Sequence, residues 1–402
     1  MTNYLFVVQR YGSRVPGGAE AFARLTAEQL VTRGHHVSVV TSCALDYRTW
    51  ADHYPPGESE IAGVRVIRLP VRRERDPERF AALSARVLGS TWASANAQQA
   101  WMTEQGPVLE GLARTLRTEA PAHDVAAVVT YLYATTFEAV HQLAGRIPIV
   151  LHPTAHDERP LRLPMIRQVF DLVDGIGYLT PEEARLAQWR FRPDATQSVV
   201  GIGFDPPPNT VDGARFRAAH DLGSDRYLLY LGRIDPNKGA DEALAFYRRL
   251  RRKNRHAPKL VMAGADAMGV EPSTDVVLTG FLSDEQRWNA MQGAMALWQP
   301  SRQESFSMVL PEAWLVGTPG VVQGACDVLA GFAARSGGAI PYHDYAEFRA
   351  AVELLGESPE LAERLAANGR DHVMTELTWD AVMERYAHLT AAVLSRRSAA
   401  GR

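Results

Sequence analysis

Short apolar runs alternate with stretches of helical spacing along most of this 402-residue sequence. Runs such as 4–8, 125–129 and 147–151 are as short and apolar as buried strands, and each is followed by a loop and then a helix-like stretch. Because crossover helices join the parallel neighbours of a sheet, this alternation predicts an α/β fold with a mostly parallel, doubly wound sheet. Further strands are expected at 37–41, 64–69 and 175–178, and a mostly helical region at 78–119.

Three consecutive prolines, Pro206 to Pro208, interrupt this pattern. Proline continues neither a helix nor a central strand, so residues 205–209 should form a stiff connector. The alternation then restarts, with a helix from Ala240 and strands expected at 227–231, 259–263, 276–279 and 294–298. A chain of 402 residues is also too long for one ordinary core. We therefore predict two Rossmann-like halves, residues 1–204 and 205–376.

The composition excludes several classes of protein. Hydrophobic residues at 46% and charged residues at 22% are typical of a soluble globular chain. A net charge of −3 provides no basic field for nucleic acid. No basic segment precedes the first apolar run, and no run approaches the ~20 residues of a membrane span, so we expect a cytoplasmic protein. Cys43 and Cys326 are the only cysteines, and they favour core packing over a disulfide or zinc framework.

The densest basic cluster is the run 248–255. Two interpretations are open. The run is either a solvated helix face or a peripheral contact with anionic lipid, where a lipid-linked acceptor would sit.

Two carboxylates, Glu304 and Glu312, stand on either side of a polar loop that leads from a strand-like run into a helix. Backbone N–H groups at such a helix entrance point outward together, at the positive end of the helix dipole, and can bind a diphosphate. Carboxylates on both sides would accept hydrogen bonds from hydroxyl groups. A ligand with sugar hydroxyls on both sides of a diphosphate is a nucleotide sugar. Alone, the spacing is common on solvated helices.

Two cations lie in a loop that leaves the first expected strand of the second half. Arg233 and Lys238, beside glycines, can clamp a diphosphate, since arginine provides a planar fork of donors and lysine a mobile point charge. They would stabilise the charge that develops on a departing diphosphate. A divalent metal is then unnecessary, and the sequence has no Asp-x-Asp motif to hold one. We predict no metal and no other cofactor.

Two loops of the first half carry further candidates. Gly17 and Gly18 follow the first strand and allow close approach of a ligand, although such a pair is more often a flexible turn. Residues 152–160 hold two histidines, two acids and an arginine at a strand end of the kind that binds ligands in open α/β sheets. The spacing of His152 and His156 would suit a metal pair, but Pro153 interrupts a helical presentation and no third ligand is evident.

These motifs together resemble the retaining glycosyltransferases of the family-four type, which have the two-domain GT-B fold. Glu304 and Glu312 match the E-x7-E signature, residues 232–239 the G-R-x-x-x-x-K-G loop, and residues 17–20 the G-G-x-E loop. The resemblance covers nearly the whole chain, with the motifs in the expected order. The strand that the resemblance implies after the E-x7-E helix, at 317–322, fits the family, but residues 323–329 then depart from the familiar glycine and glutamate pattern, so the donor sugar is not predicted.

The resemblance implies a role for each candidate. Glu312 would hold the ribose, Glu304 the transferred sugar, and the two cations the diphosphate. A histidine followed by aspartate lies near the sugar in this family, which selects His156 over His152. A C-terminal helix within 377–402 would pack back on the first domain. The implied catalytic residues are His156, Glu304, Arg233 and Lys238, and the implied donor-binding residues are Gly17, Gly18, Arg233, Lys238, Gly280, Phe281, Glu304, Phe306, Ser307, Met308, Val309 and Glu312.

We predict a retaining, metal-independent transfer of a sugar from a nucleotide-sugar donor to a hydroxyl acceptor. Retention would follow either from a carboxylate nucleophile or from front-face attack, in which the leaving phosphate takes the acceptor's proton. The alternatives are a sugar-nucleotide epimerase or hydrolase, and a non-catalytic nucleotide-sugar-binding protein. The acceptor would bind the first half, where Trp92, Trp101 and the arginine-rich segment 65–79 suit a glycan, a lipid-linked sugar or a natural product equally.

Overall fold

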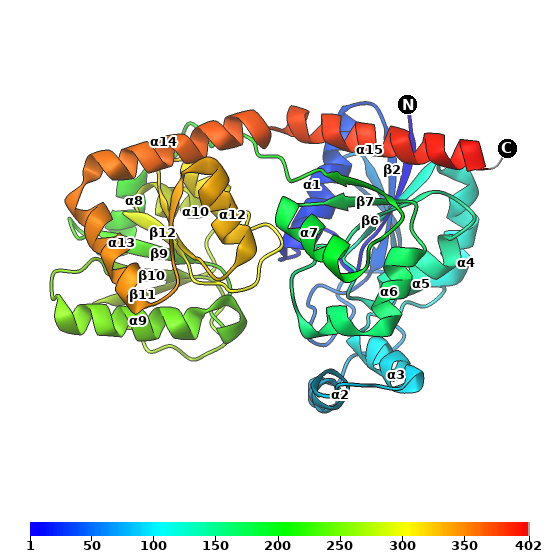
Figure 1. Ribbon diagram of the computed structural model, residues 1–402, viewed down its shortest axis with the longest axis horizontal. Helices are drawn as coiled ribbons and strands as arrows, with labels where there is room; N and C mark the ends of the chain where they lie inside the picture. Colours follow the sequence, from blue (N-terminus) through cyan, green and yellow to red (C-terminus); the bar gives the residue numbers. More distant parts are fainter. Residues whose placement is uncertain (401–402) are drawn as a thin grey trace. The chain divides into compact units, whose positions relative to one another are not determined.

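The computed structural model describes residues 1–400 and divides into two compact units. Unit 1 comprises residues 1–202 together with the chain from Val382 onward, and unit 2 comprises residues 203–381. Each unit has a central sheet with helices on its faces (Figure 1). The boundaries expected from the sequence, after residues 204 and 376, differ from these by a few positions. Residues 401 and 402 of the expected C-terminal segment lie outside the described part.

Unit 1 is built on an eight-stranded sheet in the order β3-β4-β2-β1-β5-β6-β7-β8. Only β3 runs antiparallel, against β4 at one edge. The inner strands β1 and β5 are almost fully buried, as expected where helices cover both faces of a parallel sheet. The strands are β1 (Asn3–Val7), β2 (His36–Ser42), β3 (Gly57–Ile61), β4 (Val64–Leu69), β5 (Val125–Val129), β6 (Ile149–His152), β7 (Gly175–Tyr178) and β8 (Thr196–Val199).

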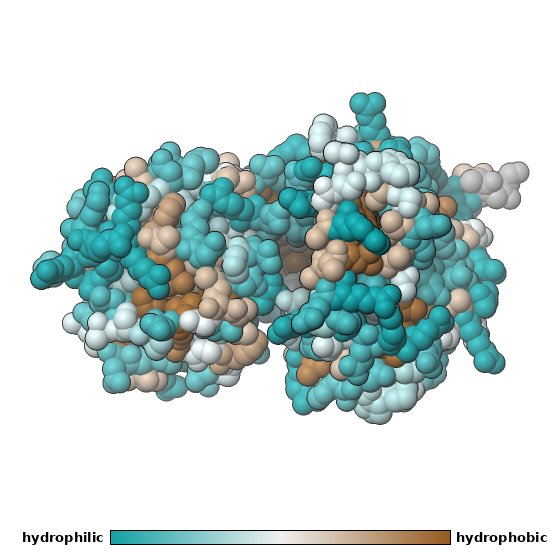
Figure 2. All heavy atoms as spheres, turned by 90° about the horizontal axis from the view of Figure 1, so that it is seen from below, coloured by the Kyte–Doolittle hydropathy of each residue, from teal (hydrophilic) through white to brown (hydrophobic). Residues whose placement is uncertain are grey.

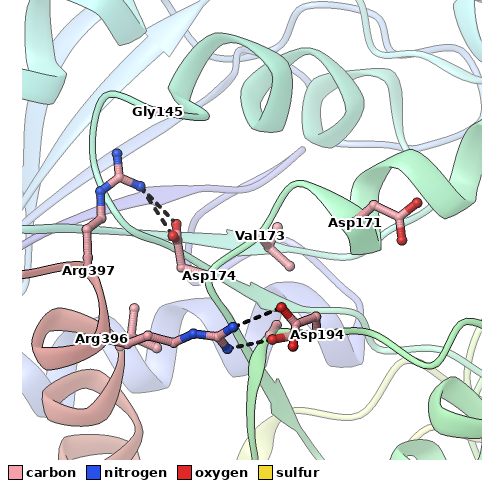
Figure 3. Close-up of a pocket in the computed structure, with 9 residues that line it drawn as sticks. Gly145, Asp171, Val173, Asp174, Asp194, Arg396 and Arg397 are labelled. Carbon is pink, nitrogen blue, oxygen red and sulfur yellow. Dashed lines mark hydrogen bonds and ion pairs between the residues drawn. The ribbon is translucent and has the colours of Figure 1, made fainter. Parts of the chain in front are cut away.

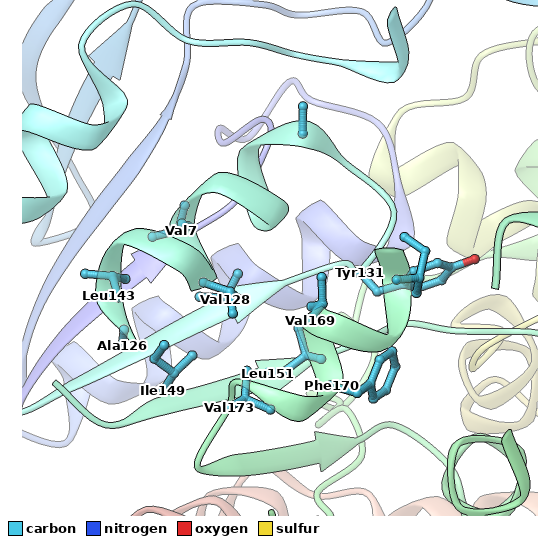
Figure 4. Close-up of a cluster of buried hydrophobic side chains, with 14 of the residues drawn as sticks. Val7, Ala126, Val128, Tyr131, Leu143, Ile149, Leu151, Val169, Phe170 and Val173 are labelled. Atoms are coloured by element: carbon cyan, nitrogen blue, oxygen red, sulfur yellow. The ribbon is translucent and has the colours of Figure 1, made fainter. Parts of the chain in front are cut away.

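Apolar side chains of the strands and helices form one large core on one face of this sheet. Figure 4 shows Val128 and Leu151 of neighbouring strands beside Val169 and Phe170 of α6. The region 78–119, expected to be mostly helical, forms α2, α3 and α4. The helices of unit 1 are α1 (Gly18–Thr32), α2 (Pro77–Gly89), α3 (Ala95–Gln105), α4 (Leu112–Glu119), α5 (Ala134–Leu143), α6 (Pro164–Asp171), α7 (Pro181–Arg190) and most of α15 (Trp379–Ala400), with short 3-10 turns η1 (Ala120–Ala122) and η2 (Arg159–Arg162).

The C-terminal helix α15 begins in unit 2 and continues on unit 1. Two ion pairs hold its last turns, as Figure 3 shows: Arg397 Nη1 lies 3.2 Å from Asp174 Oδ1, and Arg396 Nη2 lies 2.9 Å from Asp194 Oδ2. The helix also approaches β7 closely, since a Cβ on Gly175 would lie 2.5 Å from Cγ2 of Val393. Glycine at that strand position therefore makes room for the helix.

Unit 2 has a six-stranded parallel sheet in the order β11-β10-β9-β12-β13-β14. Figure 1 shows α9 on one side of these strands and α14 on the other. On the α9 side the rings of Trp298 and Phe348 stack at 4.1 Å within the core. The strands are β9 (Tyr227–Leu231), β10 (Lys259–Ala263), β11 (Val276–Gly280), β12 (Ala296–Gln299), β13 (Gly320–Gln323) and β14 (Ala339–Tyr342). The helices are α8 (Gly213–Ala219), η3 (Pro236–Lys238), α9 (Ala240–Lys253), α10 (Asp284–Gln292), α11 (Val309–Leu315), α12 (Asp327–Ser336), α13 (Tyr345–Glu357) and α14 (Pro359–Glu376).

Three strands, β3, β8 and β14, were predicted neither from the apolar pattern nor from the family resemblance. All three lie at sheet edges. An edge strand pairs on one side only and tolerates polar residues or proline, so its apolar signal is weak. Pro341 within β14 and the polar composition of β3 illustrate this.

The basic run 248–255 lies on the last turns of α9 and just beyond it. Arg251 pairs with Asp275, and the guanidinium of Arg249 lies 4.0 Å from the ring centroid of Tyr345.

Hydrophilic residues cover most of the molecular face in Figure 2, with smaller apolar areas between them. Within residues 1–400, no helix is both long enough and apolar enough to cross a membrane.

Candidate active site

In unit 2 the loops that follow β9 and β12 meet at the carboxyl edge of the sheet. The strand order reverses between these two neighbours, which is where open α/β sheets bind ligands. The ammonium of Lys238, in the loop after β9, lies 2.8 Å from Oε1 of Glu304, in the loop after β12. Two groups that are 66 positions apart in the chain are thus in direct contact.

Asp235 shapes the loop after β9. Its carboxylate accepts the N–H of Lys238 at 3.2 Å, capping η3, and pairs with the guanidinium of Arg233. The hydroxyl of Tyr230 donates to the carbonyl of Arg233 at 2.6 Å. The charged groups of Arg233 and Lys238 pair with Asp235 and Glu304, respectively. Their side chains are nevertheless 37% and 39% exposed, so a ligand can reach both cations.

We expect Gly239→Ala to displace the loop after β9. A Cβ on Gly239 would lie 2.4 Å from the carbonyl oxygen of Pro300, and the φ of 72° strains any other residue. The unfolding free energy should fall by about 1–3 kcal/mol, and the donor KM should rise. Gly269→Ala is the matched control, because Gly269 has a φ of 66° but no atom within 4 Å of its added Cβ. Thermal unfolding and donor kinetics test the prediction, and equal effects in the two variants would contradict it.

The loop after β12 combines backbone strain with a buried anchor. Ser307 has a φ of 73°, which is costly for a residue with a side chain, and among the described residues its buried hydroxyl has no hydrogen-bond partner. The ring of Phe306 packs 6.0 Å from that of Phe204 and 5.1 Å from that of Phe332. We predicted Phe306 as a donor-binding residue, but its side chain belongs to the core, which leaves only its backbone to face a ligand. Met308 and Val309 complete the turn into α11 and are partly exposed.

Glu312 is the fourth residue of α11 and is buried. Its carboxylate pairs with the guanidinium of Arg287 on α10. Burial raises the pKa of Glu312, and the charge of Arg287 opposes that rise. We did not predict Arg287, because in the sequence it is one more charged residue in a polar helix, and nothing near it marks it as the partner of Glu312.

The stretch 323–329, which departs from the family pattern, borders Glu304. Cys326 lies against the backbone of Glu304, and burial raises the pKa of Cys326 to about 11, so its thiol is neutral at pH 7. The amide of Gln323 donates to the carboxylate of Glu242 at 2.6 Å.

At the end of β11, Gly280 has a φ of 68° and Phe281 is 74% exposed.

In unit 1 a buried ion pair organises the loop after β1. Gly17, with a φ of 139°, precedes α1, and Gly18 is its first residue. Glu20, in the first turn, is 5% exposed, and its Oε1 lies 2.5 Å from Nη2 of Arg10 and 2.9 Å from the amide of Gln9. A Cβ on Gly17 would lie 2.1 Å from Oε2 of Glu20. The position of the Glu20 carboxylate in the G-G-x-E loop therefore requires a glycine at position 17.

The two histidines of the loop after β6 differ in environment. His152 is fully buried, with Nδ1 2.9 Å from the carbonyl oxygen of Gly177 and Nε2 3.2 Å from the hydroxyl of Tyr386. Burial lowers the pKa of His152 to about 4, so the ring stays neutral. His156 is 28% exposed, its Nε2 lies 3.8 Å from Oε1 of Glu158, and among the described residues its Nδ1 has no hydrogen-bond partner. His152 is thus a core residue, and His156 keeps hydrogen-bonding capacity for a ligand.

Two carboxylates that we had given no role hold the loop of His156. Glu158 accepts the hydroxyl of Tyr131 at 2.6 Å. The buried carboxylate of Glu183, in the first turn of α7, accepts the N–H of Ala155 and the N–H of Leu179, each at 2.6 Å. Burial raises the pKa of Glu183 to about 8. The contacts of Glu158 with Tyr131 and of Glu183 with Ala155 span 27 and 28 positions, so the sequence offered no signal for them.

Two family models match successive parts of the chain. The model described as "Glycosyl transferase 4-like domain" matches residues 17–203, and the model described as "Glycosyl transferases group 1" matches residues 214–372. The chain belongs to the family-four type of glycosyltransferases. The family and the enzyme class predicted from the sequence are therefore confirmed.

Relatives of this glycosyltransferase include the D-inositol 3-phosphate glycosyltransferase of Thermomonospora curvata, which is 30% identical over 234 residues. That match covers 51% of this chain and 54% of the relative, so it spans about half of the relative's length.

Solved structures of similar fold confirm the GT-B prediction. Sucrose-phosphate synthase from Thermosynechococcus elongatus matches with a TM-score of 0.71 at 17% identity, covering 98% of this chain and all (100%) of that one. Anabaena Alr3699/HepE in complex with UDP-glucose matches with a TM-score of 0.69 at 15% identity, covering 98% of this chain and 100% of that one. A trehalose-6-phosphate protein from E. coli bound with UDP-2-fluoro glucose matches with a TM-score of 0.71 at 14% identity, covering 97% of this chain and 99% of that one. The glycosyltransferase thus has the α/β GT-B fold, with two Rossmann-like domains.

Proposed function

We propose that this glycosyltransferase takes a sugar from a nucleotide-sugar donor held by unit 2 and transfers it, with retention and without a metal, to a hydroxyl group of an acceptor held by unit 1. The observation that carries the proposal is the 2.8 Å contact between Lys238 and Glu304 at the point where the strand order reverses. It joins a group suited to phosphate and a group suited to sugar hydroxyls in one place. The UDP-glucose in the HepE structure supports the same class of donor.

Arg233 and Lys238 are the groups that we assign to the diphosphate. As the sugar–phosphate bond breaks, negative charge grows on the departing diphosphate, and cations already in place stabilise it without reorganisation. Lys238 would exchange Glu304 for a phosphate oxygen when the donor binds. The carboxylate of Glu304 then becomes free to accept hydroxyl groups of the transferred sugar. The hydroxyl of Ser307, in the same loop as Glu304, has no hydrogen-bond partner among the described residues and offers one further donor.

Glu312 has a different environment, which suits a different part of the donor. Its pairing with Arg287 neutralises its charge, so that it can accept the ribose hydroxyls without repelling the neighbouring diphosphate. His156 is the residue of unit 1 that we assign to the transferred sugar. Its ring nitrogens can hydrogen-bond to a sugar hydroxyl. These roles agree with those that the family resemblance implies.

Retention has two candidate routes. A double displacement needs a carboxylate nucleophile on the face opposite the leaving group. In front-face attack the leaving phosphate accepts the proton of the acceptor hydroxyl as that oxygen bonds to the anomeric carbon and the sugar–phosphate bond breaks. The family resemblance favours the front-face route, in which Arg233 and Lys238 would stabilise the phosphate that takes the proton.

A panel of nucleotide sugars, incubated with the protein in the absence of acceptor, tests this function. Slow release of nucleoside diphosphate and free sugar is expected, since water replaces the missing acceptor. Formation of an epimer would identify an epimerase instead, and binding without turnover would identify a binding protein. Proton NMR of the product formed once an acceptor is supplied reports whether the anomeric configuration is retained.

We expect activity to survive a chelator. The two cations that we assign to the leaving group are already held by the loop after β9, so the departing charge needs no divalent ion. Transfer rates with and without excess EDTA should agree within about twofold. Complete loss of activity in EDTA, restored by magnesium or manganese, would contradict the prediction.

A further inference from the structure

A cluster of arginine and aromatic side chains in unit 1 has no role in donor binding as proposed above. This arginine–aromatic cluster comes from the loops that follow β1, β2, β4 and β5 and consists of Arg10, Tyr47, Trp50, Arg75 and Tyr133. The strand order of unit 1 reverses between β1 and β5. The cluster therefore lies at the ligand-binding edge of this sheet.

Arg75 is a buried cation with only uncharged hydrogen-bond acceptors. It is 8% exposed, and its guanidinium lies 5.2 Å from the ring centroid of Trp50. It donates to the carbonyl of Arg48 at 3.0 Å, to the side chain of Gln105 at 3.3 Å and to the carbonyl of Tyr47. Burial lowers the pKa of Arg75 because the charged form loses solvation. A buried charge is costly unless a counter-ion accompanies it.

The carboxylates nearest to Arg75 are engaged elsewhere. Asp46 and Glu104 are the acids whose charges act on it. Asp46 accepts the N–H groups and the hydroxyl of the turn at 48–49. Glu104 pairs with Arg73 and Arg79 through Oε1 alone, and among the described residues its buried Oε2 has no hydrogen-bond partner. Among the described residues, no carboxylate forms an ion pair with Arg75, so Asp46 and Glu104 act on its charge without direct contact.

The ring of Phe80 lies closest to the guanidinium of Arg75, at 4.5 Å from its centroid, and two further aromatic residues, Trp50 and Tyr133, add independent signs of a binding site. Trp50 has a φ of 60°, a strained conformation for a bulky residue, and such strain collects at functional sites. Its ring meets that of Tyr133 edge to face at 5.3 Å. Tyr133 is partly exposed, and the charge of Glu20 acts on its hydroxyl, opposed by the charges of Arg10 and Arg75. Within the described part of the chain, that hydroxyl makes no hydrogen bond.

We propose that the arginine–aromatic cluster binds an anionic group of the acceptor, a phosphate or a carboxylate, with Arg75 supplying the charge and Tyr133 a hydroxyl donor. The planar fork of arginine matches the oxygens of either group. The acceptor is then a phosphorylated or carboxylated compound with a free hydroxyl. This inference rests on the proposed function, because it takes unit 1 as the acceptor-binding unit. Arg75 also belongs to the arginine-rich segment that the sequence connected with the acceptor.

Titration with inorganic phosphate, and separately with acetate, tests the inference by calorimetry. The background is the full chain with Arg233→Ala and Lys238→Ala, which weakens the phosphate site of unit 2. One anion should bind per chain, and Arg75→Gln should weaken its binding by about tenfold to a hundredfold. Tyr133→Phe should weaken it by a smaller factor. Arg72→Gln, at an exposed arginine of the same segment, is the matched control and should leave the affinity unchanged.

Arg75→Lys separates charge from packing. If Arg75 binds the anion, lysine keeps much of the affinity; if Arg75 only ties the surrounding loops together, lysine fails as glutamine does. Tighter phosphate binding points to a phosphorylated acceptor and tighter acetate binding to a carboxylated one. Absence of anion binding, or equal affinity before and after Arg75→Gln, overturns the inference. Donor hydrolysis by the unsubstituted chain separates the two conclusions, because its loss would count against the proposed function alone.

Discussion

Lys238→Ala is expected to lower kcat/KM for the donor by about 10²–10³-fold, the usual effect of removing one preorganised donor to a developing oxyanion. The substitution removes a charge-assisted bond to the leaving diphosphate. It also leaves the carboxylate of Glu304, which is 13% exposed, without the cation that lies 2.8 Å away. An unpaired carboxylate next to the diphosphate adds repulsion to the lost attraction. Nucleoside diphosphate affinity, measured by calorimetry, should fall in parallel with the rate.

Lys259→Ala is the matched control for this substitution. Lys259 also pairs with a carboxylate, that of Asp225 at 3.0 Å, but it lies at the first residue of β10, away from the carboxyl edge of the sheet. Its loss should leave kcat/KM within about twofold, as exposed ion pairs contribute little. A double-mutant cycle with Glu304→Gln measures the coupling of Lys238 and Glu304. Unchanged nucleoside diphosphate affinity in Lys238→Ala would remove the role that we assign to Lys238.

Glu304→Gln is expected to change mainly kcat, and Glu312→Gln mainly the donor KM. Glu304 faces the transferred sugar in our proposal, and that ring gains positive charge in the transition state, so its loss should mainly lower kcat. Glu312 faces the ribose, which does not change during the reaction, so its loss should mainly raise the donor KM. The rise should be about tenfold to a hundredfold, as for a lost hydrogen bond to a charged group. Steady-state kinetics at saturating and limiting donor distinguish the two outcomes.

Two controls sharpen this comparison. A donor without ribose hydroxyls should have a high KM with the unsubstituted chain. Glu312→Gln should not raise the KM of that donor further. Arg287→Gln should resemble Glu312→Gln in KM, since the guanidinium of Arg287 holds the carboxylate of Glu312. If Glu312→Gln mainly lowered kcat, or if it weakened the dideoxyribose donor as strongly as the ordinary one, the assignment of the two glutamates would be wrong.

The central strands of both sheets were predictable, whereas three of the four edge strands were not; the fourth, β11, was expected at 276–279. β1, β5, β9 and β12 are buried on both faces, and burial on both faces requires an uninterrupted apolar run that is visible in any window of the sequence. β3, β8 and β14 pair on one side only, so their side chains meet fewer constraints. The candidate ligand-binding loops were predictable for a related reason. Glycines and cations that follow a buried apolar run indicate a strand end that faces a ligand.

The alternation of strands and helices, the break at the prolines, and the loops that carry Arg233, Lys238, Glu304 and Glu312 were all predictable from local sequence patterns. Periodicity and turn chemistry act between neighbours in the chain, so they can be recognised there. Which charges meet, in contrast, depends on the folded structure. Lys238 contacts Glu304 across 66 positions, and Arg287 contacts Glu312 across 25. His152 and Arg75 are both buried, and Arg75 forms no ion pair with a carboxylate among the residues that the structure describes. Distances of a few ångströms between remote positions set the energies of ion pairs and of burial, and no local pattern encodes those distances.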